Sequence, residues 1–151
     1  MFQGNFSNTL DDKGRVAIPA RFREALTSAG DDRLMVTAFE VSSVTCLEAY
    51  APRDWDAFVD NLNSRTGSFS PARLVFESVY LGSAQACPLD RQGRILVPQT
   101  LRRQVDFEAE VTFVGVGKKF RIFSAAGYEK VLDAYRAMLR ERPDVLNDLG
   151  V

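Results

Sequence analysis

The sequence predicts an α+β fold built from two tandem ββαββα units. Residues 10–19 (Leu-Asp-Asp-Lys-Gly-Arg-Val-Ala-Ile-Pro) return as residues 89–98 (Leu-Asp-Arg-Gln-Gly-Arg-Ile-Leu-Val-Pro), with Leu, Asp, Gly, Arg and Pro in register. Each copy is followed by the same series of helical and strand-like patterns, and such self-similarity indicates a duplicated structural unit. The 151 residues are 46% hydrophobic and 26% charged, which is enough for a compact core.

The first unit is expected over residues 1–64. Alternating aliphatic residues after the Asp-Asp-Lys-Gly-Arg turn predict a strand, and a short helix follows over residues 19–26. Strand-like runs come next at 34–39 and 44–50. The unit closes with an amphipathic helix, because apolar residues recur at i, i+3, i+4 and i+7: Trp55, Phe58, Val59 and Leu62.

The second unit is expected over residues 82–151 and has the same order. A helix is predicted at 98–105, followed by strands at 111–116 and 120–123. A longer closing helix carries its apolar residues at helical spacing, and Pro143 is expected to end it. These apolar residues are Tyr128, Val131, Leu132, Tyr135, Met138 and Leu139.

Residues 65–81 are expected to link the two units through a loop and a helix. The loop spans 65–71, and Ser70 is a suitable N-cap because Pro71 fits the first helical position. The helix has apolar side chains around most of its circumference, which favours burial on two sides. A core position between the halves and a contact with a neighbouring subunit both agree with this pattern.

Several function classes are excluded by composition. The chain has no histidine, which removes the usual Ser-His-Asp and Cys-His catalysis and His-ligated zinc. Cys46 and Cys87 are too few for a zinc site or a disulfide framework and suit a reducing cytoplasm. Gly115-x-Gly117-Lys118 lacks the spacing of a phosphate-binding loop and is read as a hairpin turn. We therefore expect no enzyme activity, no cofactor and no metal.

Membrane insertion and secretion are not expected either. No apolar run approaches the roughly 18 residues that a membrane-spanning helix needs. The first residues carry no positive charge before an apolar stretch, so a secretory signal is not predicted.

The two Asp-x-x-Gly-Arg segments are predicted to be tips of β-hairpins. A glycine at position 14 or 93 can take the positive φ that ends a three-residue loop. Asp11 would then pair with Arg15 across the first turn, and Asp90 with Arg94 across the second, which would hold each guanidinium outward. The alternative is a common tight turn whose arginine simply lies in solvent.

Positive charge is concentrated on these motifs and the helices after them. Residues 10–25 carry a net charge of +1 and residues 89–104 carry +3, whereas the whole chain carries −1. Arginine suits phosphates and guanine edges, although a solvated basic helix face is the alternative. Lys118, Lys119 and Arg121 are expected to be a solvated hairpin tip. The candidate DNA-binding residues are Asp11, Lys13, Arg15, Arg21, Arg23, Asp90, Arg91, Arg94, Arg102 and Arg103.

Together, Met-Phe-x-Gly at residues 1–4 and the motifs at 10–19 and 89–98 closely resemble the MraZ family. These bacterial transcriptional regulators are related to the AbrB-type swapped-hairpin proteins, and the resemblance covers essentially the whole chain. It implies a swapped-hairpin β-barrel with flanking helices, in which each half is similar to one AbrB subunit. It also implies that Asp11/Arg15 and Asp90/Arg94 form the DNA-facing surface.

The resemblance further implies binding of double-stranded DNA at direct repeats upstream of the operon for cell division and cell-wall synthesis, usually with repression. It implies a ring-shaped homo-oligomer of octamer class that acts in the cytoplasm at the nucleoid. The alternative function is an oligomeric protein-interaction scaffold whose arginines contact an acidic partner. Two departures stand out: residues 120–123 are Phe-Arg-Ile-Phe where the family commonly has a Phe-Glu-Ile-Trp-like stretch, and Gln92 replaces Lys13 in the second copy.

Overall fold

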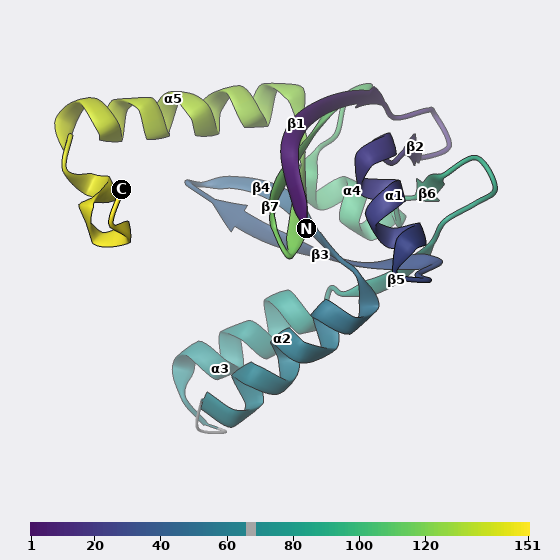
Figure 1. Ribbon diagram of the computed structural model, residues 1–151, viewed down its shortest axis with the longest axis horizontal. Helices are drawn as coiled ribbons and strands as arrows, with labels where there is room; N and C mark the ends of the chain where they lie inside the picture. Colours follow the sequence, from purple (N-terminus) through teal and green to yellow (C-terminus); the bar gives the residue numbers. More distant parts are fainter. Residues whose placement is uncertain (66–68) are drawn as a thin grey trace.

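The computed structural model describes residues 1–65 and 69–151 (Figure 1). The first half contains β1 (Phe2–Thr9), β2 (Arg15–Ala17), α1 (Ala20–Ser28), β3 (Arg33–Val41), β4 (Val44–Tyr50) and α2 (Pro52–Arg65). A short helix α3 (Pro71–Val75) continues into a π-helix η1 (Phe76–Leu81). The second half contains β5 (Gln85–Pro88), β6 (Arg94–Leu96), α4 (Gln99–Val105), β7 (Glu110–Gly117), β8 (Lys119–Ser124), α5 (Ala125–Glu141) and a 3-10 helix η2 (Val145–Leu149).

The predicted order of elements is confirmed, because ββαββα occurs twice along the chain. Helix α5 ends before Pro143, as expected, and β7 ends at Gly117, with Lys118 between it and β8. Residues 66–68 of the predicted linking loop lie outside the described residues.

The strands of the two halves are interleaved. A six-stranded antiparallel sheet has the order β1-β7-β8-β4-β3-β5, and β2 pairs with β6 in a separate two-stranded ladder. Strand β1 therefore joins β7 of the second half, and β5 joins β3 of the first half. The mixed α+β class is confirmed. The ladders of the described residues leave the six-stranded sheet open between β1 and β5, so they do not form a closed barrel.

One hydrophobic core is shared by both halves. Phe22 of α1 packs against Phe120 of β8, with ring centroids 4.8 Å apart, and Phe2 of β1 contacts both rings. Equivalent residues of the two copies, Val16 and Ile95 among them, are buried in the same cluster. Because each half supplies one side of this core, burial of apolar surface links the halves to each other.

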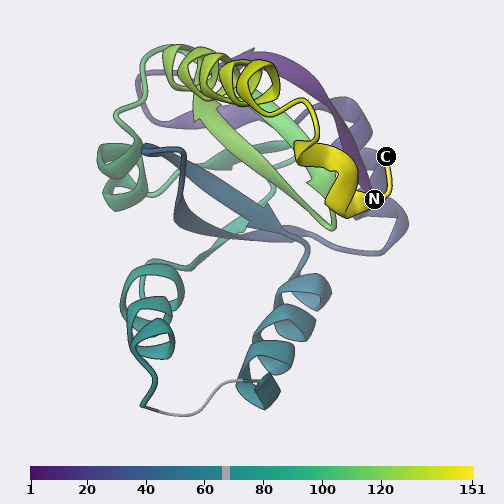
Figure 2. The same ribbon diagram turned by 90° about the vertical axis from the view of Figure 1, so that its left-hand side faces the viewer.

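Helices α2, α3 and η1 form a helical arm (residues 52–65 and 71–81) that projects from the sheet (Figures 1 and 2). The Ser70 hydroxyl accepts a hydrogen bond from the Arg73 amide at 3.2 Å, with Pro71 next to it, which confirms the predicted helix start. The expected burial on two sides is not reached within the chain, because Val75 and Val79 are about 60% exposed, and the alternative contact with a neighbouring subunit stays a prediction. Only one side of the helix packs on α2 and the sheet, through Tyr80 and Phe76.

A buried carboxylate fastens the helical arm to the sheet. The Glu48 side chain on β4 is fully buried and accepts hydrogen bonds from the Tyr80 hydroxyl, from Lys119 Nζ at 3.0 Å and from Arg121 Nε at 2.8 Å. Lys119 also lies over the rings of Tyr50 and Phe58. The interpretation of Lys119 and Arg121 as a solvated tip is therefore wrong, although Lys118 is exposed.

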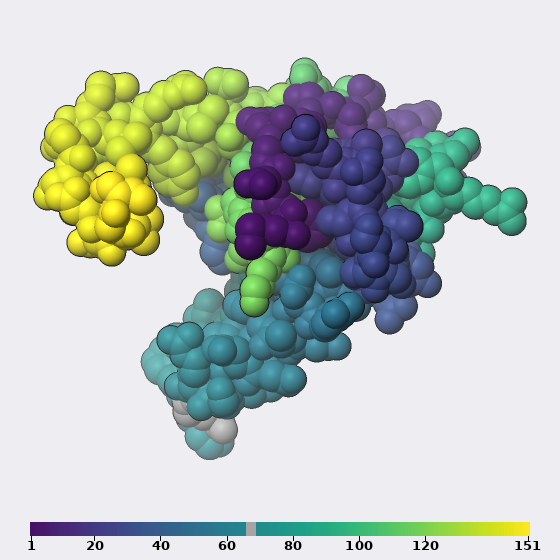
Figure 3. All heavy atoms as spheres, viewed as in Figure 1, coloured from purple at the N-terminus to yellow at the C-terminus, as the bar shows by residue number. Residues whose placement is uncertain are grey.

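The C-terminal helix α5 forms a second projection, seen at the opposite end from β2 and β6 in Figures 1 and 3. The Ser124 hydroxyl accepts from the Gly127 amide at 3.0 Å and begins the helix. Val131 is buried against β4 and β8, but Tyr135, Met138 and Leu139 further along the helix are about 40% exposed. The amphipathic pattern is thus only partly covered within the chain.

We predict that Glu48→Gln lowers the free energy of unfolding by about 3–5 kcal/mol, since it leaves two partly buried cations without their counter-charge. Asp32→Asn is the matched control, because Asp32 pairs with Arg33 at the surface and such pairs contribute about 0–1 kcal/mol. Chemical denaturation of the two variants and the parent measures both values. Equal stability of the two variants would contradict this account of the Glu48 cluster.

Candidate nucleic-acid interface

The two copies of the repeated motif meet in the β2–β6 ribbon, the ladder in which Arg15 lies opposite Leu96, Val16 opposite Ile95 and Ala17 opposite Arg94. Val16 and Ile95 are buried, so this central pair faces the core. Because successive strand residues point to opposite faces, the other four residues share the outer face of the ribbon. Arg15 and Arg94 are diagonal neighbours there, a relation that places Cα atoms about 7–8 Å apart.

Each strand of the ribbon is preceded by a tight turn: the first turn (residues 11–15) and the second turn (residues 90–94). Asp11 Oδ1 accepts from the backbone amides of Lys13 at 2.9 Å and Arg15 at 2.8 Å. Asp90 Oδ1 makes the same two bonds in the second turn. Gly14 and Gly93 have φ values of +89° and +74°, so the predicted turn conformation is confirmed.

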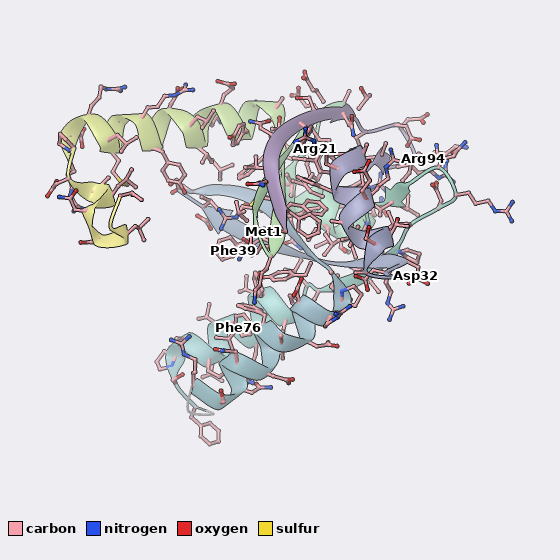
Figure 4. The ribbon with its side chains drawn as sticks, in the orientation of Figure 1. Met1, Arg21, Asp32, Phe39, Phe76 and Arg94 are labelled. Atoms are coloured by element: carbon pink, nitrogen blue, oxygen red, sulfur yellow. The ribbon has the colours of Figure 1, made fainter. Side chains whose placement is uncertain are left out.

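The strand pairing beyond the turns differs from the expectation. A hairpin would pair the strands on either side of one turn, but β2 pairs with β6 of the other copy. The turns of the two halves therefore lie at one end of the molecule, beside the ribbon, as Figure 1 shows. The labelled Arg94 lies at this end in Figure 4. This exchange brings both motifs to a single surface.

The predicted Asp–Arg pair is present in the second turn only. Arg94 Nε donates to Asp90 Oδ2 at 2.9 Å, with both side chains between a third and two-fifths exposed. In the first turn the described contacts of the Asp11 carboxylate are backbone amides, so the predicted pairing with the Arg15 side chain is wrong. Among the described residues, Arg15 has no ion pair, and its guanidinium is free to meet a ligand.

The carboxylates of both turns are held in their charged form. The hydrogen bond from the Arg15 amide holds the pKa of Asp11 below its usual value, and the Lys13 amide and the Arg15 charge act in the same direction. The hydrogen bond from the Arg94 amide similarly lowers the pKa of Asp90, with help from the Arg94 side chain. Arg94 also contributes to the lowering at Asp11, which shows that the two turns lie within electrostatic range of each other.

Two of the candidate arginines support the turns from behind. Arg23 of α1 donates from Nε to the carbonyl of Ile18 at 3.0 Å and packs so tightly on Gly93 that a Cβ there would lie 2.3 Å from Arg23 Cδ. Arg102 of α4 packs in the same way on Gly14. Each arginine thus holds the turn of the opposite copy.

This crossed support also uses the backbone. The Gly14 carbonyl accepts from the Val97 amide at 2.8 Å, and the Gly93 carbonyl accepts from the Ile18 amide at 2.9 Å. Arg102 Nε is buried and has no hydrogen-bond partner among the described residues. The sequence analysis missed this arrangement, and the only signal for it is that Arg23 and Arg102 occupy matching positions of the repeat.

The remaining candidate cations are exposed. They are Lys13, Arg21, Arg91 and Arg103, and Arg21 is labelled on α1 in Figure 4. Arg103 lines a cavity of about 570 Å³ beside the first turn together with Arg102, Asp11 and Asp12. Its neighbours therefore include carboxylates of the opposite copy as well as a second arginine.

The described residues offer little for other chemistry. Residues 1–65 and 69–151 contain no group of three metal-ligating side chains. Burial raises the pKa of Cys46 to about 12 and that of Cys87 to about 11, so neither thiol is a nucleophile at neutral pH. Every helix in this part of the chain is too short or too polar to cross a bilayer.

Comparison with known proteins agrees with this arrangement. The family model described as "MraZ protein, putative antitoxin-like" matches residues 1–76 and again residues 80–145, one match for each half. A protein of Saccharophagus degradans named transcriptional regulator MraZ is 38% identical over 82% of each chain. Proteins with the same name from Azoarcus sp. (strain BH72) and Thermoanaerobacter sp. (strain X514) are 38% identical over 92% of this chain and 91% of theirs, and 32% identical over 100% of both, respectively. The name describes a non-enzymatic role. With both motifs, both halves and nearly the full length matched, the chain belongs to the MraZ family.

Proposed function

We propose that this protein is a sequence-specific, DNA-binding transcriptional regulator that binds duplex DNA through the β2–β6 ribbon and its two turns. The observation that carries the proposal is the shared outer face of the ribbon, where Arg15 and Arg94 point the same way. B-DNA has a major groove about 12 Å wide that admits a two-stranded ribbon. The names of the relatives, transcriptional regulator MraZ, support the same function.

The residues of this surface are assigned different roles. Arg15 and Arg94 reach base edges or the nearest phosphates, and the guanidinium of an arginine can donate to the O6 and N7 acceptors of one guanine at once. The exposed cations Lys13, Arg21, Arg91 and Arg103 hold the DNA backbone, which gives affinity without sequence information. Asp11 and Asp90 order the amides of the turns. Arg23 and Arg102 are positioning residues, because their side chains support the turns.

The domain organisation is proposed on the same basis. Residues 1–64 and 82–151 are the two repeats and residues 65–81 connect them. The exchange of β1 and β5 between the halves supports a single-chain version of the swapped-hairpin arrangement that the family resemblance implies, here with an open sheet.

We further propose a ring-shaped homo-oligomer of octamer class that binds direct repeats upstream of the cell-division and cell-wall operon, its own gene included, usually as a repressor. It would act in the cytoplasm at the nucleoid. A chain with a net charge of −1 binds a polyanion weakly by itself. Linked copies make later contacts intramolecular and gain about 10²- to 10⁴-fold in avidity. The exposed apolar side chains of the helical arm and α5 support contacts between copies.

A protein-interaction scaffold is the second candidate, and the same exposed apolar side chains favour it. In that case the arginines of the ribbon would contact an acidic partner. Binding to DNA would then be indifferent to sequence and would disappear at modest salt concentration.

We predict that the double variant Arg15→Ala/Arg94→Ala loses about 10²- to 10³-fold in affinity for a duplex from upstream of its own gene, because a bidentate contact is worth about 1–3 kcal/mol. Gel-shift titration against a scrambled duplex measures this loss. The control Arg53→Ala/Arg136→Ala removes the same charge from exposed positions on α2 and α5. Unchanged specific binding by the folded ribbon variant would refute the proposed function.

A second prediction separates backbone contacts from positioning. For Arg103→Ala, the plot of log binding constant against log salt concentration should become less steep by about 0.9, since the variant removes one phosphate contact. Its melting temperature should be unchanged. Arg23→Ala should lower the melting temperature as well as the affinity, because it leaves the second turn unsupported. Thermal unfolding and salt titrations of both variants test the assignment, and the opposite pattern would exchange the two roles.

A further inference from the structure

The outer face of the β2–β6 ribbon has one large apolar side chain. Val16 and Ile95 are the central pair of the ladder, and a local two-fold axis between them relates Arg15 to Arg94 and Ala17 to Leu96, since the members of each couple stand at the same offset from the central pair on their own strands. Ala17 is half-buried and small, whereas Leu96 is 53% exposed. The two arginines of this face are therefore related by the two-fold axis, whereas the exposed Leu96 has only the small Ala17 at the related position.

Leu96 is closely framed by the two arginines. It lies directly opposite Arg15 in the ladder, a relation that places Cβ atoms about 4.5–5.5 Å apart. It also lies two residues after Arg94 on the same strand and the same face, about 7 Å along β6. A group that contacts both guanidinium groups would consequently lie beside Leu96, with Ala17 at the opposite corner of the face.

We propose that Leu96 is a specificity-determining residue that contacts the 5-methyl group of a thymine in the major groove. The inference rests on the proposed function of the ribbon as a DNA-binding surface. The thymine methyl is the apolar feature among the base edges of that groove, and apolar side chains are its usual partners. Burial of one such methyl group corresponds to about a three- to fivefold difference in affinity at each bound site.

This contact would give the ribbon a direction along the duplex. Ala17 ends at Cβ and cannot reach what Leu96 reaches from the related position. The copy that carries Leu96 is also the more positively charged one, because it has Arg91 and Arg103 where the first copy has Asp12 and Glu24. A bound site should thus place its thymine on the Leu96 side of the centre. The chain should therefore bind an asymmetric site with higher affinity in one orientation than in the other.

The test replaces thymine by deoxyuridine, which removes only the methyl group. The duplex is the segment upstream of its own gene that the protein protects from cleavage, with each thymine replaced in turn. We expect the parent protein to lose about three- to fivefold in affinity for deoxyuridine at one position per bound site. Leu96→Ala should bind the thymine and deoxyuridine duplexes equally, at the level of the parent on deoxyuridine.

Two further variants sharpen the test. Val116→Ala shortens another exposed apolar side chain, on β7, and should retain the deoxyuridine penalty of the parent. Leu96→Ala combined with Ala17→Leu should move the sensitive position to the other side of the site centre. Equal binding of both duplexes by the parent, or an undiminished penalty in Leu96→Ala, would overturn the Leu96 proposal while leaving DNA binding intact. Failure of the parent to prefer the protected duplex over a scrambled one would instead refute the proposed function.

Discussion

The pairing of β2 with β6 is the interaction on which the rest of this structure depends. Each strand has only three residues, and a two-stranded ribbon is marginal without support. Support comes from burial of Val16 and Ile95 and from the backbone bonds that join each turn to the strand of the other copy. Since this one ladder sets the distance between the two motifs, a change that loosens it also separates Arg15 from Arg94.

The electrostatics of the surface follow from how its carboxylates are used. Asp11 and Asp90 lie beside the arginines that face outward, and free carboxylates there would repel a polyanion. Both are engaged by backbone amides at 2.8–2.9 Å, so part of their charge is neutralised within the turns. Arg15 is not tied to Asp11, whereas Arg94 is held by Asp90. The two turns therefore have the same backbone hydrogen bonds, but the Arg94 guanidinium is held by an ion pair and the Arg15 guanidinium is not.

The sequence predicted local features well and long-range ones poorly. Local patterns predicted the order of the elements, the positive φ of Gly14 and Gly93, and the cap at Ser70, because each depends on neighbouring residues. The partner of β2 lies about 80 residues away, and no local pattern specifies it. Arg23 and Arg102 were predicted as DNA-binding residues, and their contacts with the turns were missed for the same reason, since the glycines on which they pack belong to the opposite copy. Lys119 and Arg121 were misread because Glu48, their buried partner, is some 70 residues distant.

The pairing of β1 with β7 of the second half also determines when the sheet can form during synthesis of the chain. Phe2 pairs with Gly117, so the first strand leaves the ribosome long before its neighbour has been made. At about 5–20 residues per second, roughly 100 residues of synthesis separate the two by about 5–20 seconds. During this interval the backbone groups of β1 that later pair with β7 have no partner strand, and an unpaired strand of this kind is open to pairing with another chain.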